Sequence, residues 1–302
     1  MKKNLKMSAA ILTAALVAGA LTACGGSSST PTTAPSAADT TAADSGSAAD
    51  TGSTTGDVSA DVQKIIDAGV LKVGVKTDVP CFSLQNTATG EYEGLEDDLA
   101  YTIAGKIFGC TPDEAKEKKL VAFQGVTAKT RGPLVENGEL DMVIATFTIT
   151  EERKETYNFS TPYFTDAVGL LVLKDSGINS IEDLDGKVIG VAQGSTSQKG
   201  FEAYVAEKGI NVTPTFEEFD GYPALAAALS AKNIDVFSVD RAILAGYRDD
   251  TNKLLDDRYA EQEYGVCTKK ENTGLAELVD GVVTDLKDSG KLAEMIKDWG
   301  IE

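Results

Sequence analysis

From Val58 onward, short apolar runs alternate along the chain with amphipathic stretches. Residues 71–75 and 187–192 have the composition of strands, whereas 95–108 and 195–208 have that of helices. Alternation at this spacing is typical of α/β proteins, in which helices flank mostly parallel sheets. A chain of 302 residues with 42% hydrophobic content can form real cores. Its length predicts about two domains.

The first residues have the pattern of an export signal. Lys2, Lys3 and Lys6 precede an apolar run over 8–20, which is too short to span a bilayer. The run ends in Leu-Thr-Ala followed by Cys24, which resembles the bacterial lipoprotein cleavage box. We therefore expect residues 1–23 to be removed and a lipid on Cys24 to anchor the protein to the cell membrane, outside the cytoplasm. The alternative is an ordinary secretory signal with a chance cysteine.

Residues 25–56 are almost entirely Ser, Thr, Ala, Gly and Pro, and they include no aromatic residue, Lys or Arg. Such a segment cannot bury enough apolar surface to offset its ordering entropy. We expect 24–57 to be a flexible tether, with a root-mean-square reach of about 30 Å.

The charge and residue types exclude several classes of function. The chain has 47 acidic and 28 basic residues, a formal charge of −19, and no histidine. An acidic chain does not suit nucleic acid, and a chain without histidine cannot form a His-dependent triad or a His metal site. Cys81, Cys110 and Cys267 lack metal-ligand spacing, so we expect no metal, no cofactor, and free thiols or at most one disulfide.

One segment, 145–153, follows a buried apolar run and contains several polar groups. Ligands of open α/β sheets bind at the carboxyl ends of strands. In an extended chain Thr146 and Thr148 would share one face. Thr150 is a candidate helix N-cap, and Arg153 could offer a bidentate fork to a carboxylate. The alternative for Arg153 is a surface residue paired with a nearby glutamate.

Two further segments also join a strand to a helix. Gly194 permits a tight turn, and the amides of Thr196 and Ser197 open a helix, whose N-terminus favours an anion. Asp240 ends an apolar strand and could accept from an ammonium group. The alternatives are an ordinary turn and a capping aspartate. Together, the three segments suit a zwitterionic amino acid.

Several segments carry a family resemblance across residues 62–301: LKVGVKTDV (71–79), GEYEGLEDDLA (90–100), DMVIATFTITEER (141–153), FSTPYF (159–164), 189–197 and YGV (264–266). Their order and spacing resemble the family 3 extracellular solute-binding proteins of polar amino-acid ABC transporters. The resemblance implies a periplasmic-binding-protein-like (type II) α/β fold, a two-lobe Venus flytrap. Its two mixed, mostly parallel sheets would be flanked by helices and joined by two hinge crossovers.

The resemblance also implies boundaries and roles. Lobe 1 would comprise 58–162 plus 265–302, lobe 2 would comprise 168–259, and the hinges would lie at about 163–167 and 260–264. Arg153 would clamp the ligand α-carboxylate, assisted by Thr148 and the backbone amide of Thr196. Asp240 would take the α-ammonium, with Thr146 also in contact.

Two segments bear on specificity. Relatives that bind glutamine, or lysine, arginine and ornithine, have an aromatic residue near Ala128, whereas this chain has TAKTRGP over 127–133. Together with Lys76, this segment is similar to the glutamate- and aspartate-binding branch. Because a buried carboxylate needs a paired cation, Arg131 is the first candidate, Lys76 the second and Lys129 a weaker one. The alternative for these side chains is solvent-exposed charge.

The expected function is therefore capture of glutamate or aspartate between two closing lobes, by a monomer that delivers it to an ABC transporter permease. Glutamine or another polar neutral amino acid is the alternative within this class. Outside it, the alternatives are a cyclohexadienyl-type dehydratase on the same fold, or a surface sensor or adhesin. We expect no catalytic activity, since the sequence adds no catalytic group to the binding set.

Overall fold

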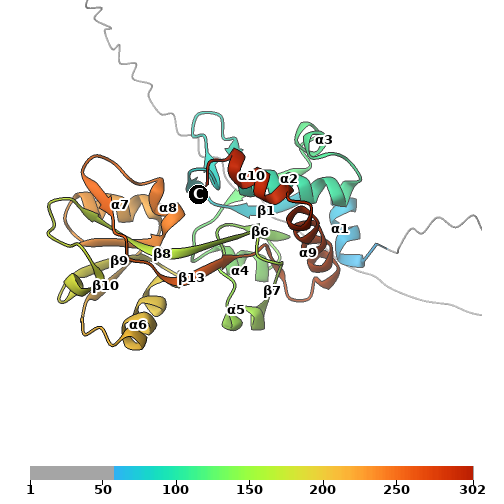
Figure 1. Ribbon diagram of the computed structural model, residues 1–302. Helices are drawn as coiled ribbons and strands as arrows, with labels where there is room; N and C mark the ends of the chain where they lie inside the picture. The colour runs from blue at the N-terminus through green and yellow to red at the C-terminus, as the bar shows by residue number, and fades with distance from the viewer. Residues whose placement is uncertain (1–57, 302) are drawn as a thin grey trace, which may run out of the picture. The chain divides into compact units, whose positions relative to one another are not determined.

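Two mixed sheets with flanking helices form the part of the chain that the computed structural model describes, residues 58–301 (Figure 1). The expected signal peptide, the expected lipid attachment at Cys24 and the expected tether lie outside the described residues. Within 58–301, none of the helices combines the length and the apolar character that a membrane crossing requires.

The first sheet, which defines lobe 1, has the order β5-β1-β6-β14-β7. The pairs β5-β1 and β1-β6 are parallel, and the pairs β6-β14 and β14-β7 are antiparallel. Its strands are β1 (Leu71–Val75), β5 (Val121–Gly125), β6 (Met142–Ile144), β7 (Tyr157–Phe159) and β14 (Cys267–Lys269). A small sheet adds β2 (Asp78–Val79), β3 (Ser83–Gln85) and β4 (Tyr92–Glu93).

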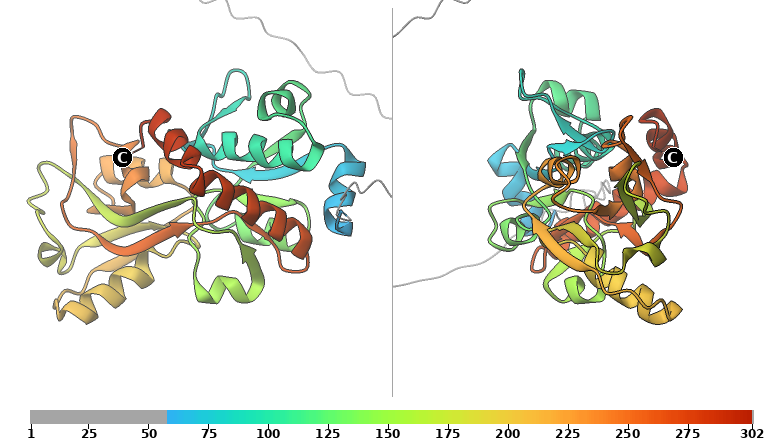
Figure 2. Two further views of the ribbon diagram at one scale, coloured as in Figure 1. Left: turned by 45° about the vertical axis from the view of Figure 1, so that its right-hand side comes forward. Right: turned by 90° about the vertical axis from the view of Figure 1, so that its left-hand side faces the viewer.

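The helices of lobe 1 are α1 (Ala60–Ala68), α2 (Leu95–Phe108), α3 (Pro112–Glu117), α4 (Arg131–Glu136), α5 (Glu151–Thr156), α9 (Thr273–Asp288) and α10 (Lys291–Asp298). The C-terminal helix α9 packs against α1 and α2, and α10 packs against α9 (Figure 2). The last part of the chain thus returns to complete the lobe that the first part began.

The second sheet, which defines lobe 2, has the order β10-β9-β11-β8-β12, and β13 also pairs with β8. Its strands are β8 (Phe164–Leu173), β9 (Val188–Ala192), β10 (Thr215–Phe219), β11 (Val236–Asp240), β12 (Asn252–Leu254) and β13 (Tyr259–Tyr264). Its helices are α6 (Ser197–Lys208), α7 (Tyr222–Ser230), α8 (Arg241–Ala245) and the short 3₁₀ helix Ile181–Leu184. Ser180 and Asp183 form a capping box at the start of that helix, where the Asp183 carboxylate accepts from the Ser180 N–H at 3.2 Å.

The two segments expected as crossovers, 163–167 and 260–264, lie side by side. Apart from Tyr163, which precedes β8, they belong to β8 and β13, which pair antiparallel from Tyr264↔Phe164 to Tyr259↔Val168 (Figure 1). The pairing shifts register between Tyr259 and Glu261, and Ala260 has φ 47°. Such a bulge bends and re-aims a strand. The assignment of these segments as hinges, and the exact lobe boundaries, remain predictions.

The type II two-lobe fold is confirmed in its essentials, with one correction. The sheets are mixed, but they are not mostly parallel: parallel pairings account for four of the nine in the two large sheets. Strands joined through a crossover helix are parallel, whereas β8 and β13 carry the chain out of lobe 1 and back, and so run antiparallel. The sequence pattern shows which strands are separated by helices, but it does not show that the chain leaves lobe 1 along β8 and returns to it along β13.

Candidate functional site

Arg153 lies where the two lobes meet. It is held by the first turn of α5, where the hydroxyl of Thr150 accepts from the Arg153 N–H at 3.1 Å, as the predicted N-cap requires. Its guanidinium donates to the carbonyl of Thr148 in lobe 1 at 2.7 Å and to that of Gly194 in lobe 2 at 3.0 Å. The alternative of a glutamate pair does not hold, because Glu151 and Glu152 pair with Lys154 and Lys199. Burial lowers the pKa of Arg153 to about 9.

Phe147 stacks with two guanidinium groups. The Arg131 guanidinium lies 4.1 Å from the centre of its ring and that of Arg153 lies 4.7 Å from it. Cation–π contacts of this kind orient both cations from one residue. Sequence reasoning missed Phe147, although it stands between two predicted ligand threonines.

Arg131 is 2% exposed, so the alternative of a solvent-exposed charge is wrong for it. Its Nη1 donates to the carbonyls of Ala145 and Thr146 at 2.6 and 2.9 Å. Its Nε is buried and has no partner among residues 58–301. A buried donor left unpaired in the described structure is an open position for a ligand acceptor.

Thr146 does not have the extended backbone that the sequence predicted. Its φ is 45°, in the left-handed region that favours glycine, so it does not share one face of a strand with Thr148. The turn brings its carbonyl to Arg131 and its N–H to the Glu96 carboxylate at 2.6 Å. Its hydroxyl is buried, with no partner in the described part of the chain. Strained backbone of this kind is concentrated at binding sites.

Glu96, in the first turn of α2, was not predicted to contribute to the site. It is fully buried, and one carboxylate oxygen accepts from both Thr146 N–H and the Tyr163 hydroxyl, the latter at 2.6 Å. Burial raises the pKa of Glu96, opposed by these hydrogen bonds and by the charges of Lys76 and Arg131. Glu96 therefore links α2 to Thr146 in the segment 145–153 and to Tyr163, the first residue of the expected crossover.

Lys76 is 1% exposed, so for it too the alternative of a solvent-exposed charge is wrong. It follows β1, pairs with Asp78 at 3.3 Å, and lies 4.3 Å from the centre of the Tyr222 ring in lobe 2. Burial lowers its pKa, which the neighbouring Asp78 partly offsets. Lys129, the weaker candidate, donates to the Gln193 side chain of lobe 2 at 3.0 Å.

Asp240 ends β11 and is 6% exposed. It occupies the N-cap position of α8, but within the described structure its carboxylate makes no capping hydrogen bond and instead accepts from the Tyr264 hydroxyl. Burial raises the pKa of Asp240 to about 7, and the charges of Arg131 and Arg153 act in the opposite direction. The capping alternative therefore does not explain where this carboxylate points.

Thr148 and Thr196 are joined by a residue that sequence reasoning missed. Both hydroxyls donate to the side-chain oxygen of Gln262, at 2.6 and 2.7 Å. Ser197 is the buried first residue of α6. The predicted residues of the second segment thus lie at the start of an α-helix, as expected.

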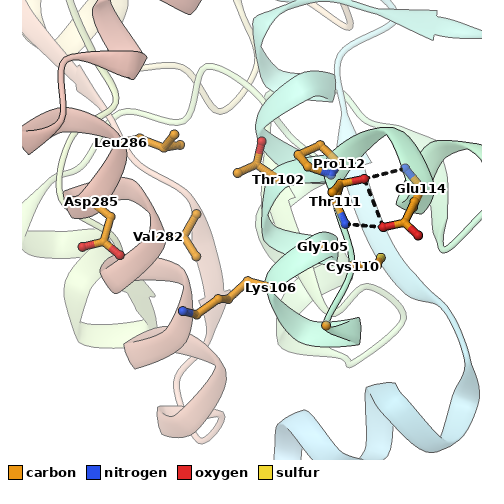
Figure 3. Close-up of a pocket in the computed structure, with 11 residues that line it drawn as sticks. Thr102, Gly105, Lys106, Cys110, Thr111, Pro112, Glu114, Val282, Asp285 and Leu286 are labelled. Atoms are coloured by element: carbon orange, nitrogen blue, oxygen red, sulfur yellow. Dashed lines mark hydrogen bonds between the residues drawn. The ribbon is translucent and has the colours of Figure 1, made fainter.

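Thr148, Arg153 and Thr196 also line a cavity of about 830 Å³ between α5, α6 and β13, together with Gln262. The cavity lining does not include five other predicted residues, which are buried: Lys76, Thr146, Arg131, Ser197 and Asp240. A different hollow of about 530 Å³, between α2, α3 and α9, contains none of the predicted residues (Figure 3). The candidate ligand site is the interior cluster of Lys76, Asp78, Glu96, Arg131, Thr146, Arg153 and Asp240, in which Arg131 Nε and Thr146 Oγ1 have no partner among the described residues and Arg153 also reaches the cavity.

Residues 58–301 contain no group of three or more Cys, Asp or Glu side chains placed to hold a metal ion. In the same range, Cys81, Cys110 and Cys267 are all free thiols.

The chain matches known proteins over most of its length. Residues 71–302 match the bacterial extracellular solute-binding proteins, family 3. The chain belongs to this family. It is similar to the ABC transporter glutamine-binding protein GlnH of Bacillus subtilis, with 34% identity over 82% of this chain and 88% of the relative. It is also similar to the glutamine-binding protein of Geobacillus stearothermophilus, with 40% identity over 70% of this chain and 76% of the relative.

The solved structure of an ancestral arginine-binding protein bound to glutamine has the same fold. Its TM-score is 0.65 and its identity is 29%, over 78% of this chain and 99% of that chain. The glutamate-binding protein GluB of Corynebacterium efficiens is less similar, with 27% identity over 77% of this chain and 79% of the relative. The expected place in the glutamate- and aspartate-binding branch is therefore not confirmed.

Proposed function

We propose that this family 3 solute-binding protein binds L-glutamine between its two lobes and delivers it to an ABC transporter permease. The family and the relatives support an amino-acid transport role and agree with a location outside the cytoplasm. The glutamine-binding names of two relatives, at 34% and 40% identity, support the choice of ligand. Attachment to the membrane through Cys24 is part of the same proposal.

Two charged residues of the interior cluster would bind the backbone groups of the amino acid. Arg153 offers a cation for the α-carboxylate at the boundary of the lobes, and Asp240 offers a carboxylate for the α-ammonium. Because Arg153 is carried by lobe 1 and Asp240 by lobe 2, one zwitterion contacts both. Contacts made to both lobes favour the closed arrangement.

The number of charges in the cluster favours a ligand whose side chain is neutral. Lys76, Arg131 and Arg153 supply three cations, and Asp78, Glu96 and Asp240 supply three carboxylates. Lys76 is paired with Asp78. The charges of Lys76 and Arg131 both favour the ionised form of buried Glu96. With three cations and three carboxylates already present, a glutamate side chain would add a fourth carboxylate and leave the bound site with a net charge of −1, whereas a glutamine amide adds no charge. An unpaired buried charge is strongly unfavourable.

Calorimetric titration with glutamine, glutamate, aspartate and arginine tests this proposal. We expect glutamine to bind at least about tenfold more tightly than glutamate, since leaving one charge buried and unpaired costs roughly 2–5 kcal/mol. Arg153→Ala should raise the Kd for glutamine about 30-fold or more for the same reason.

Three results would contradict the proposal at different levels. If glutamate bound more tightly than glutamine, the ligand would be an acidic amino acid, and the transport role would still stand. A loss below about threefold for Arg153→Ala would mean that the α-carboxylate is bound elsewhere. Turnover of prephenate or arogenate, the dehydratase alternative, would replace the binding role altogether.

A further inference from the structure

Gln262 connects the two lobes through a single oxygen atom. It lies on β13, its side chain is 2% exposed, and its Oε1 accepts from the hydroxyls of Thr148 and Thr196 at 2.6 and 2.7 Å. Thr148 belongs to the segment that follows β6 in lobe 1, whereas Thr196 is the N-cap residue of α6 in lobe 2. The two threonines are therefore held by the same acceptor.

The orientation of this amide is determined by its other end. Its Nε2 donates to the carbonyl of Ala260 at 2.9 Å. A carbonyl only accepts, so the amino group must face Ala260 and the oxygen must face the two hydroxyls. Ala260 has φ 47° at the bulge of β13, and a Cβ on Gly200 of α6 would lie 2.6 Å from its Cβ. The bulge is thus closely packed on α6, and it aims the Gln262 side chain.

The number of hydroxyl protons limits what the two threonines can do. A threonine hydroxyl has one proton, and both protons are donated to Gln262. In this arrangement neither hydroxyl can also donate to a ligand carboxylate. The carbonyl of Thr148 accepts from Arg153, so a threonine held by Gln262 also positions the guanidinium.

We propose that Gln262 is a positioning residue, which joins Thr148 to Thr196 and so favours the closed arrangement in which Arg153 and Asp240 face one ligand. The hydroxyl of Thr196 then acts through Gln262 and not by direct contact with the ligand. The identity of the ligand used in the test rests on the proposed function, whereas the link between the lobes does not.

A double-mutant cycle on the Kd for glutamine tests the role of Gln262. We expect Thr196→Val to weaken binding about fivefold in the otherwise unchanged protein, the effect of one hydrogen bond. In the Gln262→Leu background the same substitution should weaken it less than about twofold, because its partner is already gone. Glu263→Leu, an exposed change on the same strand, is the control and should leave the Kd unchanged.

Small-angle scattering of the ligand-free protein gives a second measurement that does not need glutamine. We expect a larger radius of gyration for Gln262→Leu and for Thr196→Val than for the unchanged protein and Glu263→Leu. Thr196→Val is nearly isosteric, which keeps the test available if Gln262→Leu does not fold.

An equal effect of Thr196→Val in both backgrounds, or an unchanged radius of gyration, would overturn the role of Gln262. If the unchanged protein does not bind glutamine, the proposed ligand fails, and the scattering measurement alone decides on Gln262.

Discussion

At the scale of single residues, the site depends on buried charges whose neighbours determine their ionisation. Asp240 is the clearest case, because it must be ionised to accept an ammonium group, while burial favours its neutral form. The Tyr264 hydroxyl and the charges of Arg131 and Arg153 favour the ionised form. The balance leaves its pKa at about 7.

This balance predicts that ligand affinity depends on pH. Asp240 has a raised pKa of about 7, so its carboxylate is available above that pH and is lost as the pH falls through it. From about pH 8 to about pH 6 we expect the Kd for glutamine to rise roughly tenfold, since one proton must leave before the ammonium can pair. Calorimetry across this range measures the change. Asp240→Asn should bind weakly and show no such slope, whereas a flat profile in the unchanged protein would rule out this role for Asp240.

At the scale of elements, short-range features hold the ligand residues in place. Thr150 caps α5 and positions Arg153, and the first turn of α2 positions Glu96. The start of α2 is closely packed, because a Cβ on Gly94 would lie 2.0 Å from the carbonyl oxygen of Phe82. That atom belongs to the backbone and cannot move aside without shifting the small sheet.

We therefore expect Gly94→Ala to destabilise the protein by roughly 2–4 kcal/mol, through backbone displacement. In a domain of this size that corresponds to a fall in Tm of about 5–10 °C. Gly281→Ala is the matched control: it lies in α9, and a Cβ there meets no atom within 4 Å in the described part of the chain. It should stabilise the protein by about 0.5–1 kcal/mol, because alanine favours helix. Similar Tm values for the two variants, measured by calorimetry, would show that the backbone around Gly94 shifts to accept a Cβ at little cost in stability.

At the scale of the whole described molecule, the two lobes approach each other through backbone as well as side chains. Gly194 of lobe 2 faces lobe 1, where a Cβ would lie 3.0 Å from both the Ala128 carbonyl oxygen and the Lys129 Cα. The exposed ion pair between Glu152 and Lys199 also joins the lobes, but exposed pairs of this kind contribute little. The close approach of the Gly194 backbone to Ala128 and Lys129 therefore constrains closure of the lobes more than the ion pair does.

A side chain at Gly194 should hold the lobes apart. We expect Gly194→Val to raise the Kd for glutamine at least about 30-fold, and to leave a larger radius of gyration in the presence of ligand. Gly177→Val supplies the control, because Gly177 has φ 77° against 75° for Gly194, and a Cβ there meets nothing within 4 Å among the described residues. Both variants carry the same backbone strain, of about 1–2 kcal/mol, and only one blocks closure. Equal affinities would mean that the approach at Gly194 does not limit binding.

The sequence by itself determined the alternation of strands and helices, the cap at Thr150, the family motifs and the polar groups at strand ends. These features depend on local order along the chain, which periodicity and capping chemistry encode. The backbone turn at Thr146 and the roles of Glu96, Gln262 and Tyr264 were decided only by the tertiary structure. Gln262 meets Thr148 across 114 residues and Glu96 meets Tyr163 across 67. Because such partners are chosen by the packing of distant strands and helices, no pattern of neighbouring residues predicts them.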